Sequence, residues 1–228
     1  MMTRVFLAIA ALVLSTVSTV AHAQNVVDVG VVKNDDIKIV QKLLYPKARN
    51  NEFGAHLVMM PFDAFTFTPA MSLSFAHHMR EDLGFEGQLT GGYGLKNSHY
   101  KQLESPAYGV APDVYRFLGS AMADIQWSPI YAKMNVAGKR IFHHDIFFTG
   151  GLGVTYEEAI QPDGTAAIAP TLGLGMGARI YTGKNYAMRL QLRDDMMRQK
   201  RVKTEETQAW FLKQNVSLMI GVSKLGGK

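Results

Sequence analysis

Residues 166–195 contain two segments whose apolar and polar side chains alternate with a period of two, and the turn-rich sequence TGKN joins them. In the second segment, leucines and methionines form one face while Arg189 and Arg193 stand on the other. In the first segment, the face opposite the apolar side chains carries glycines, including Gly173 and Gly175. A period of two is typical of β-strands and not of helices. The pair therefore predicts two adjacent strands, each with one apolar and one polar face.

The small side chains on the glycine face help to decide between two all-β folds, a soluble β-sandwich and a membrane β-barrel. In a soluble β-sandwich the polar face is solvated, and it has no need of small residues. In a barrel within lipid the apolar face points outwards, and the polar face must fill a narrow interior. Gly173, Gly175 and Gly177 would then leave interior volume for Arg189 and Arg193. We therefore predict a transmembrane β-barrel, with the soluble sandwich as the alternative.

The N-terminus predicts export. Arg4 precedes an apolar run from Val5 to Leu14, and the small-x-small sequence AHA precedes Gln24, as in a secretory signal peptide over residues 1–23. A retained membrane anchor is the alternative, but the apolar run is shorter than the ~20 residues of a spanning helix. Export combined with a barrel predicts the outer membrane of a Gram-negative cell envelope.

The composition excludes several classes of function. The chain of 228 residues has no cysteine, so it can form no disulfide and has no thiol chemistry. Its formal net charge of +5 is mild, and no basic block is dense enough to indicate nucleic-acid binding. Although 47% of the residues are hydrophobic, the apolar residues after Gln24 are spread by alternation. The mature chain is therefore expected to have no transmembrane helix.

The alternation recurs along the chain. Residues 24–50 form a polar periplasmic leader with a predicted short helix at IKIVQKLL, and residues 51–228 form the barrel domain. Strands are expected within 52–59, 65–78, 81–96, 116–127, 144–158, both halves of 166–195, and 207–223. Most of these eight segments reach the ~10 residues that a tilted strand needs to cross a bilayer.

The loops predict an orientation. Residues 97–115 read as the longest loop, on the cell exterior, and TGKN reads as a tight periplasmic turn. Long loops outside and short turns inside are typical of outer-membrane barrels. Residues 128–144 form a rather long periplasmic connection, for which an extension of the strands is one interpretation.

The charged residues of the polar faces are predicted to meet inside the barrel. An eight-stranded barrel is only wide enough to be filled by side chains, and buried charges must be paired. We predict a structural network of lumen charges formed by Glu52, Glu86, Arg116, Asp124, Asp145, Arg179, Arg189, Arg193, Asp195 and Lys213. The alternative is a small pore or transport barrel whose water-filled lumen is lined by the three arginines of 166–195.

The histidines are the candidate catalytic residues, because some outer-membrane barrels modify lipids. The pairs His77-His78 and His143-His144 fall at the periplasmic end of their strands, which is the wrong end for outer-leaflet chemistry. His99, next to Ser98, is the single histidine in the exterior loop. We therefore expect no enzyme activity, no catalytic residues, no metal and no cofactor, and keep a lipid-modifying enzyme as a further alternative.

Several short motifs resemble a known family. The order VQKLLYPKARNNEF, MPFDAF, LSFAHHMREDLGFEGQL, WSPIYAKMN, HHDIFFTGGLGVT, MRLQLRDD and SLMIGVSK, from about Val40 to Ser223, resembles the outer-membrane β-barrel domain family common in myxobacteria and related predatory bacteria. The resemblance implies a structural or docking component of the cell envelope, in some members part of an envelope-spanning, gliding-motility complex. Expected partners are outer-membrane lipid, the barrel-assembly machinery and a periplasmic or envelope protein.

Overall fold

The computed structural model describes residues 45–110, 112–136, 140–160, 166–183, 185–200 and 210–226. The predicted signal peptide (1–23) and the predicted leader helix lie outside the described residues. Of the predicted leader, residues 45–50 are described, and they lead directly into the first strand. The strands belong to the compact unit that begins at Leu43.

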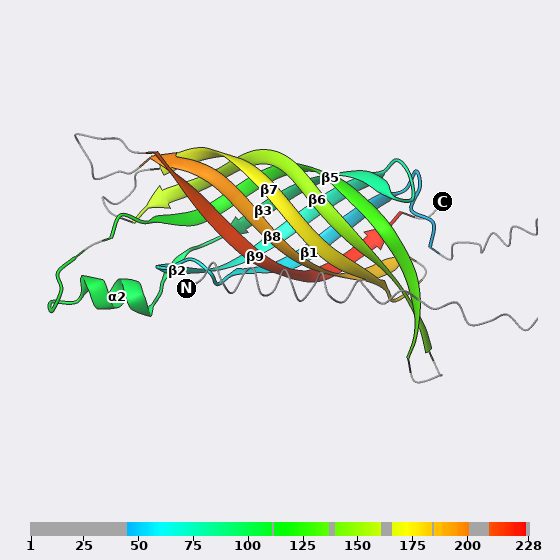
Figure 1. Cartoon of the computed structure of the whole chain (residues 1–228), viewed down its shortest axis with the longest axis horizontal. Coiled ribbons are helices and arrows are strands. Elements are labelled where there is room, and N and C mark those ends of the chain that lie inside the picture. Colours follow the sequence, from blue (N-terminus) through cyan, green and yellow to red (C-terminus); the bar gives the residue numbers. More distant parts are fainter. Residues whose placement is uncertain are drawn as a thin grey trace, which may run out of the picture. The chain divides into compact units, whose positions relative to one another are not determined.

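The described residues form a closed antiparallel barrel (Figure 1). The elements are β1 (Asn51–Met60), β2 (Thr66–His78), β3 (Leu83–Gly92), β4 (Leu95–Lys96), α2 (Ser98–Glu104), β5 (Tyr115–Val136), β6 (Arg140–Ala159), β7 (Ala166–Tyr181), β8 (Tyr186–Lys200) and β9 (Trp210–Leu225). Strand β1 pairs with both β9 and β2, which closes the sheet. The two-residue β4 adds only to β2, so eight strands of the described chain make the wall. The predicted eight-stranded barrel is confirmed.

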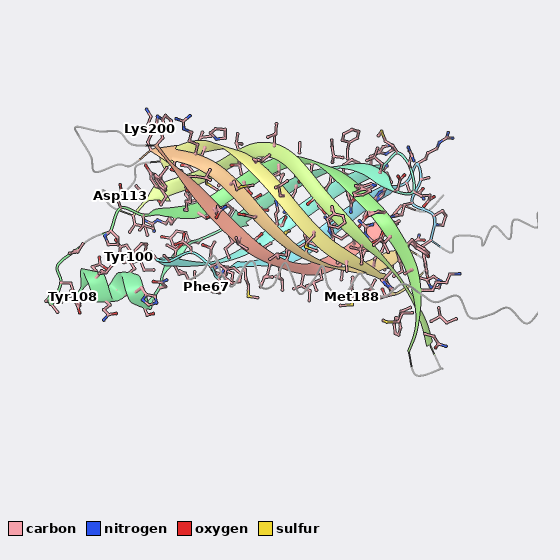
Figure 2. The ribbon with its side chains drawn as sticks, in the orientation of Figure 1. Phe67, Tyr100, Tyr108, Asp113, Met188 and Lys200 are labelled. Carbon is pink, nitrogen blue, oxygen red and sulfur yellow. The ribbon has the colours of Figure 1, made fainter. Side chains whose placement is uncertain are left out.

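The wall of the barrel is apolar outside and polar inside. In β8 the side chains of Met188, Leu190 and Leu192 are 45%, 57% and 42% exposed, whereas Arg189 and Gln191 between them are buried. Figure 2 shows side chains projecting outwards along the whole wall, Met188 among them. Such a continuous apolar exterior suits lipid and not water. The barrel is therefore of the membrane-spanning type.

The loop predicted at residues 97–115 contains a short helix. Asn97 caps α2, because its side-chain oxygen accepts a hydrogen bond from the backbone N–H of Tyr100 at 3.0 Å. Tyr100 is fully buried in a small cluster with Val114 and Ile160, and this cluster ties the loop to the barrel end. Among the described residues, no helix has the length and apolar character needed to cross a membrane.

The connection at residues 128–144 is an extension of two strands. A register shift between Trp127 and Ile130 interrupts the β5–β6 ladder at Pro129, and the ladder then continues through seven further pairs to Val136 and Arg140. A β-bulge at this place is expected, since proline has no N–H to donate. The neighbouring strand β3 ends its pairing with β5 at Trp127. The hairpin therefore projects past the wall at one end of the barrel (Figure 1).

Candidate functional site

The candidate site is the barrel interior, where inward side chains from all eight long strands meet. Register fixes which groups are neighbours on adjacent strands: Arg179 of β7 stands directly beside Arg189 of β8, and Gly175 stands beside Arg193. Because each strand alternates, the residues next to these in sequence face lipid. The ion pairs form four levels along the barrel, and the first of them lies at the end where β1 starts.

At the first level Arg179 lies between two carboxylates. Its Nη1 donates to Asp145 Oδ2 at 2.9 Å, and its Nε lies 3.1 Å from Glu52 Oε1. Glu52 also pairs with His78 Nε2 at 2.8 Å. Lys47, which precedes β1, reaches in and donates from Nζ to Asp145 at 2.5 Å. Two acids are thus shared among three basic groups.

The second level is built on Arg189. Its two terminal nitrogens donate to the two carboxylate oxygens of Glu86 at 2.7 and 2.8 Å, which is the bidentate arrangement that favours arginine over lysine. The ring of Phe147 lies between the levels, with its centroid 4.5 Å from the Arg189 guanidinium carbon and 5.2 Å from that of Arg179. The aromatic face therefore separates two like charges and contacts both.

The third level is built on Arg193. Its terminal nitrogens donate to Asp124 at 2.8 and 3.0 Å, and its Nε donates to Asp195 Oδ1 at 2.7 Å. A side chain on Gly173 would overlap this guanidinium, and one on Gly175 would overlap Thr149 Oγ1. The glycine face of β7 is thus the space in which Arg193 and its neighbours lie.

At the opposite end of the barrel, a carboxylate is the centre of the polar contacts. Lys213 Nζ donates to Glu157 Oε1 at 2.8 Å, and Asn215 donates to the same oxygen at 3.1 Å. Gln199 donates to the other oxygen of Glu157. Each of these four levels contains at least one ion pair, and the same interior also holds an apolar cluster of Val58, Met60, Phe117 and Met219.

One predicted lumen residue lies elsewhere. Arg116 is on the outer surface of β5, half-buried, where it pairs with Glu158 at 3.1 Å and contacts the Tyr93 ring. The cause is a register shift between Phe117 and Gly119, which reverses the alternation at this end of β5. Phe117 faces the interior in its place and is 3% exposed. The assignment of Arg116 to the lumen is therefore corrected.

The structure also brings in interior groups that the sequence did not indicate. Glu157 could have been found, because it alternates with Thr155 on the inner face of the same strand. Lys47 gave no signal, since it lies outside every predicted strand. Phe147 is apolar, so the alternation of polar and apolar residues gives no reason to place it in a polar interior.

The histidines weighed for catalysis are dispersed. His77 hydrogen-bonds Asn51 at the barrel rim, and His78 pairs with Glu52 in the lumen. His143 contacts the ring of Tyr45, and His99 lies exposed in α2. Within the part of the chain that the structure describes, no group of three or more His, Cys, Asp or Glu residues could hold a metal ion.

The lumen arginines are shut off from water. Arg179, Arg189 and Arg193 are 0%, 2% and 1% exposed, and they are the largest fully buried side chains among the described residues. A water-filled channel would leave the side chains along it exposed to water. The structure thus has no open channel beside these three arginines.

Comparisons with known proteins give likenesses at low identity. No protein-family model matches the chain, and no curated protein matches it. The N-terminal β-barrel domain of OprF from Pseudomonas aeruginosa is 11% identical, with a TM-score of 0.48 over 78% of this chain and 98% of that chain. Neisserial surface protein A is 12% identical, with a TM-score of 0.41 over 77% and 95%. Ail of Yersinia pestis is 12% identical, with a TM-score of 0.39 over 78% and 97%.

Strand pairing and the apolar exterior, independently of those likenesses, make this chain an outer-membrane-type β-barrel. The family resemblance drawn from the sequence motifs stays a prediction.

Proposed function

We propose that this chain is a non-conducting outer-membrane barrel that acts as a structural or docking component of the cell envelope. The observation that carries the proposal is the filled lumen, in which the three arginines are buried and paired. A barrel that offers no path through its centre must act through its outer wall or through the parts beyond the membrane. The family resemblance adds an envelope-spanning, motility-type complex as the setting.

Conductance tests the first half of the proposal. The purified, folded chain is inserted into planar lipid bilayers, with a general porin in the same bilayer system as the positive control. We expect no stepwise current from the chain, because water cannot pass Arg179, Arg189 and Arg193. Reproducible unitary steps would instead favour a transport barrel.

The β5–β6 hairpin is the best-placed docking element. It projects past the wall, where β3 no longer pairs with β5. Its Ile130 and Met134 are 48% and 53% exposed there. Residues 128–144 contain Lys133, Lys139 and Arg140 but no acidic residue. A protein partner that binds this hairpin should therefore present apolar groups together with carboxylates.

Site-specific cross-linking in intact envelopes tests the docking role. A photo-reactive residue at Met134 should give one discrete protein adduct, whereas the same residue at Leu89, which is 64% exposed on the lipid-facing wall, should not. The double variant Lys133→Glu, Lys139→Glu should weaken the adduct at Met134. Equal adducts at both positions, or none at Met134, would reject the hairpin as the docking element.

A further inference from the structure

A groove in the lipid-facing wall lies over Ala55 at the barrel end where β1 begins. Ala55 of β1 stands in register between Leu73 of β2 and Val222 of β9, which are 64% and 59% exposed. The small methyl between two large side chains leaves a trough of about 380 Å³. Phe53, 60% exposed, stands at one end of it. The groove is thus apolar and open to the acyl chains of the membrane.

A cation lies at the mouth of this groove. Lys224 belongs to the same outward face as Val222, and it is paired in register with Phe53 and with Tyr186. Its ammonium is 5.8 Å from the centroid of the Tyr186 ring. Because β9 ends at Leu225, Lys224 is at the rim, where a lysine can extend its charge to the headgroup level. No carboxylate of the described residues forms an ion pair with it.

A second groove on the same wall provides an internal comparison. It lies over Gly87 and Ala123, has a volume of about 370 Å³, and is walled by Phe75, Phe85 and Ile125. Its lining contains no lysine or arginine; the basic residue in it is His77, whose ring hydrogen-bonds the Asn51 side chain. Two grooves of nearly equal size thus differ in whether a lysine stands at the mouth.

We propose that the Ala55 groove is a binding site for an acidic glycerophospholipid. One acyl chain lies in the trough against Ala55, Leu73 and Val222, and the phosphate contacts the Lys224 ammonium. Apolar burial and one opposite charge are the two features that hold lipid at a protein surface. The Gly87 groove can hold an acyl chain, but it has no lysine or arginine to select an acidic headgroup. This site does not depend on the docking role of the hairpin.

Lipid competition in reconstituted bilayers tests the proposal. Spin-labelled phosphatidylglycerol and phosphatidylcholine with identical acyl chains are compared for the motionally restricted fraction on the folded chain. A single lysine at the membrane surface predicts a preference of about five-fold for phosphatidylglycerol at one site. The preference should disappear in Lys224→Gln, and Ala55→Phe should remove the site for both lipids.

The second groove supplies the control variant. Ala123→Phe fills a trough of the same size, and the preference for phosphatidylglycerol should survive it. Heat-modifiable migration shows that each variant is folded before it is compared. A preference that persists in Lys224→Gln, or that is lost equally in Ala55→Phe and Ala123→Phe, would overturn the proposal.

Discussion

Arg189 donates two hydrogen bonds to Glu86, a residue 103 positions earlier in the chain, through nitrogen–oxygen distances of 2.7 and 2.8 Å. The two residues lie on β8 and β3, which are four places apart in the ring of eight strands. The pair therefore crosses the full width of the lumen. It joins walls that share no backbone hydrogen bond.

Arg189→Met should destabilise the barrel strongly, because Glu86 would keep its charge in a site that water does not reach. Breaking a buried pair in this way costs about 3–5 kcal/mol. The free energy of unfolding in lipid vesicles, from urea titration, measures the loss. Arg198→Met is the matched control. Arg198 is on β8, as Arg189 is, but its side chain is exposed and lies over the ring of Trp210 on β9. Equal effects of the two variants would contradict a structural role for the cross-lumen pair.

Gly173→Ala should lower the free energy of unfolding by about 1–3 kcal/mol through overpacking. The added methyl would overlap the Arg193 guanidinium, which two aspartates hold in place. Gly91→Ala provides the comparison, because a methyl there meets nothing within 4 Å. The same urea titration serves both variants. If Gly91→Ala were the more harmful change, the packing of β7 against Arg193 would be misassigned.

Two adjacent aspartates should respond to substitution with opposite signs. Asp194 faces lipid between Leu174 and Val216, and its Oδ1 is buried without a hydrogen-bond partner. It lies eight residues from Tyr186 on a tilted strand, within the apolar band of ~25 Å. Asp194→Leu should therefore raise the free energy of unfolding by about 1 kcal/mol. Asp195→Leu should lower it, because Asp195 pairs with Arg193.

The signs of the two changes decide this prediction. Both variants are unfolded in the same vesicles, so the contribution of the lipid to the free energy of unfolding is the same for both. A loss of stability in Asp194→Leu would show that Asp194 has a favourable partner in the membrane.

Lys47 should give the barrel a pH-dependent stability in the alkaline range. Burial lowers the pKa of Lys47 below its ordinary value of 10.5, and Asp145 opposes that shift only in part. The unfolded chain then binds more protons than the folded chain between the lowered pKa and 10.5, so the free energy of unfolding rises with pH across that window. Lys47→Met should lack this rise.

Urea titrations at several pH values between 8 and 11, on the two proteins side by side, isolate the Lys47 contribution. Groups common to both proteins, such as the tyrosines, cancel in the difference. A rise with pH of the same size in Lys47→Met would assign the effect to another group.

The barrel and most of its interior were predictable, because alternation specifies which residues share a face. Arg189, Gln191 and Arg193 follow one another at every second position, and a regular strand must place them together. The glycines on the neighbouring strand β7 then indicate that this polar face lies in the narrow interior, where large side chains need small neighbours. Neither inference needs any knowledge of tertiary contacts.

The exceptions arise where the strands are irregular or where a contact comes from outside them. Arg116 was misplaced because a bulge after Phe117 changes the parity, and nothing in the local sequence marks it. Alternation does not decide whether the strands extend beyond Trp127, since Pro129 interrupts the pattern there. Lys47 reaches Asp145 across 98 positions of sequence, and periodicity contains no information about such a contact.

The long reach of the lumen pairs also bears on how the barrel is assembled. A shift of one residue in the pairing of β8 would turn Arg189 and Arg193 towards lipid. A shift of two residues would keep the polar face inside. It would still move Arg189 of β8 along the barrel away from Glu86 of β3, and Glu86 would lose its cation. Because β3 and β8 lie four strands apart, the distance between Arg189 and Glu86 depends on the register of every strand pair between them. The buried carboxylate of Glu86 is thus paired only when the strands are aligned as they are in this barrel.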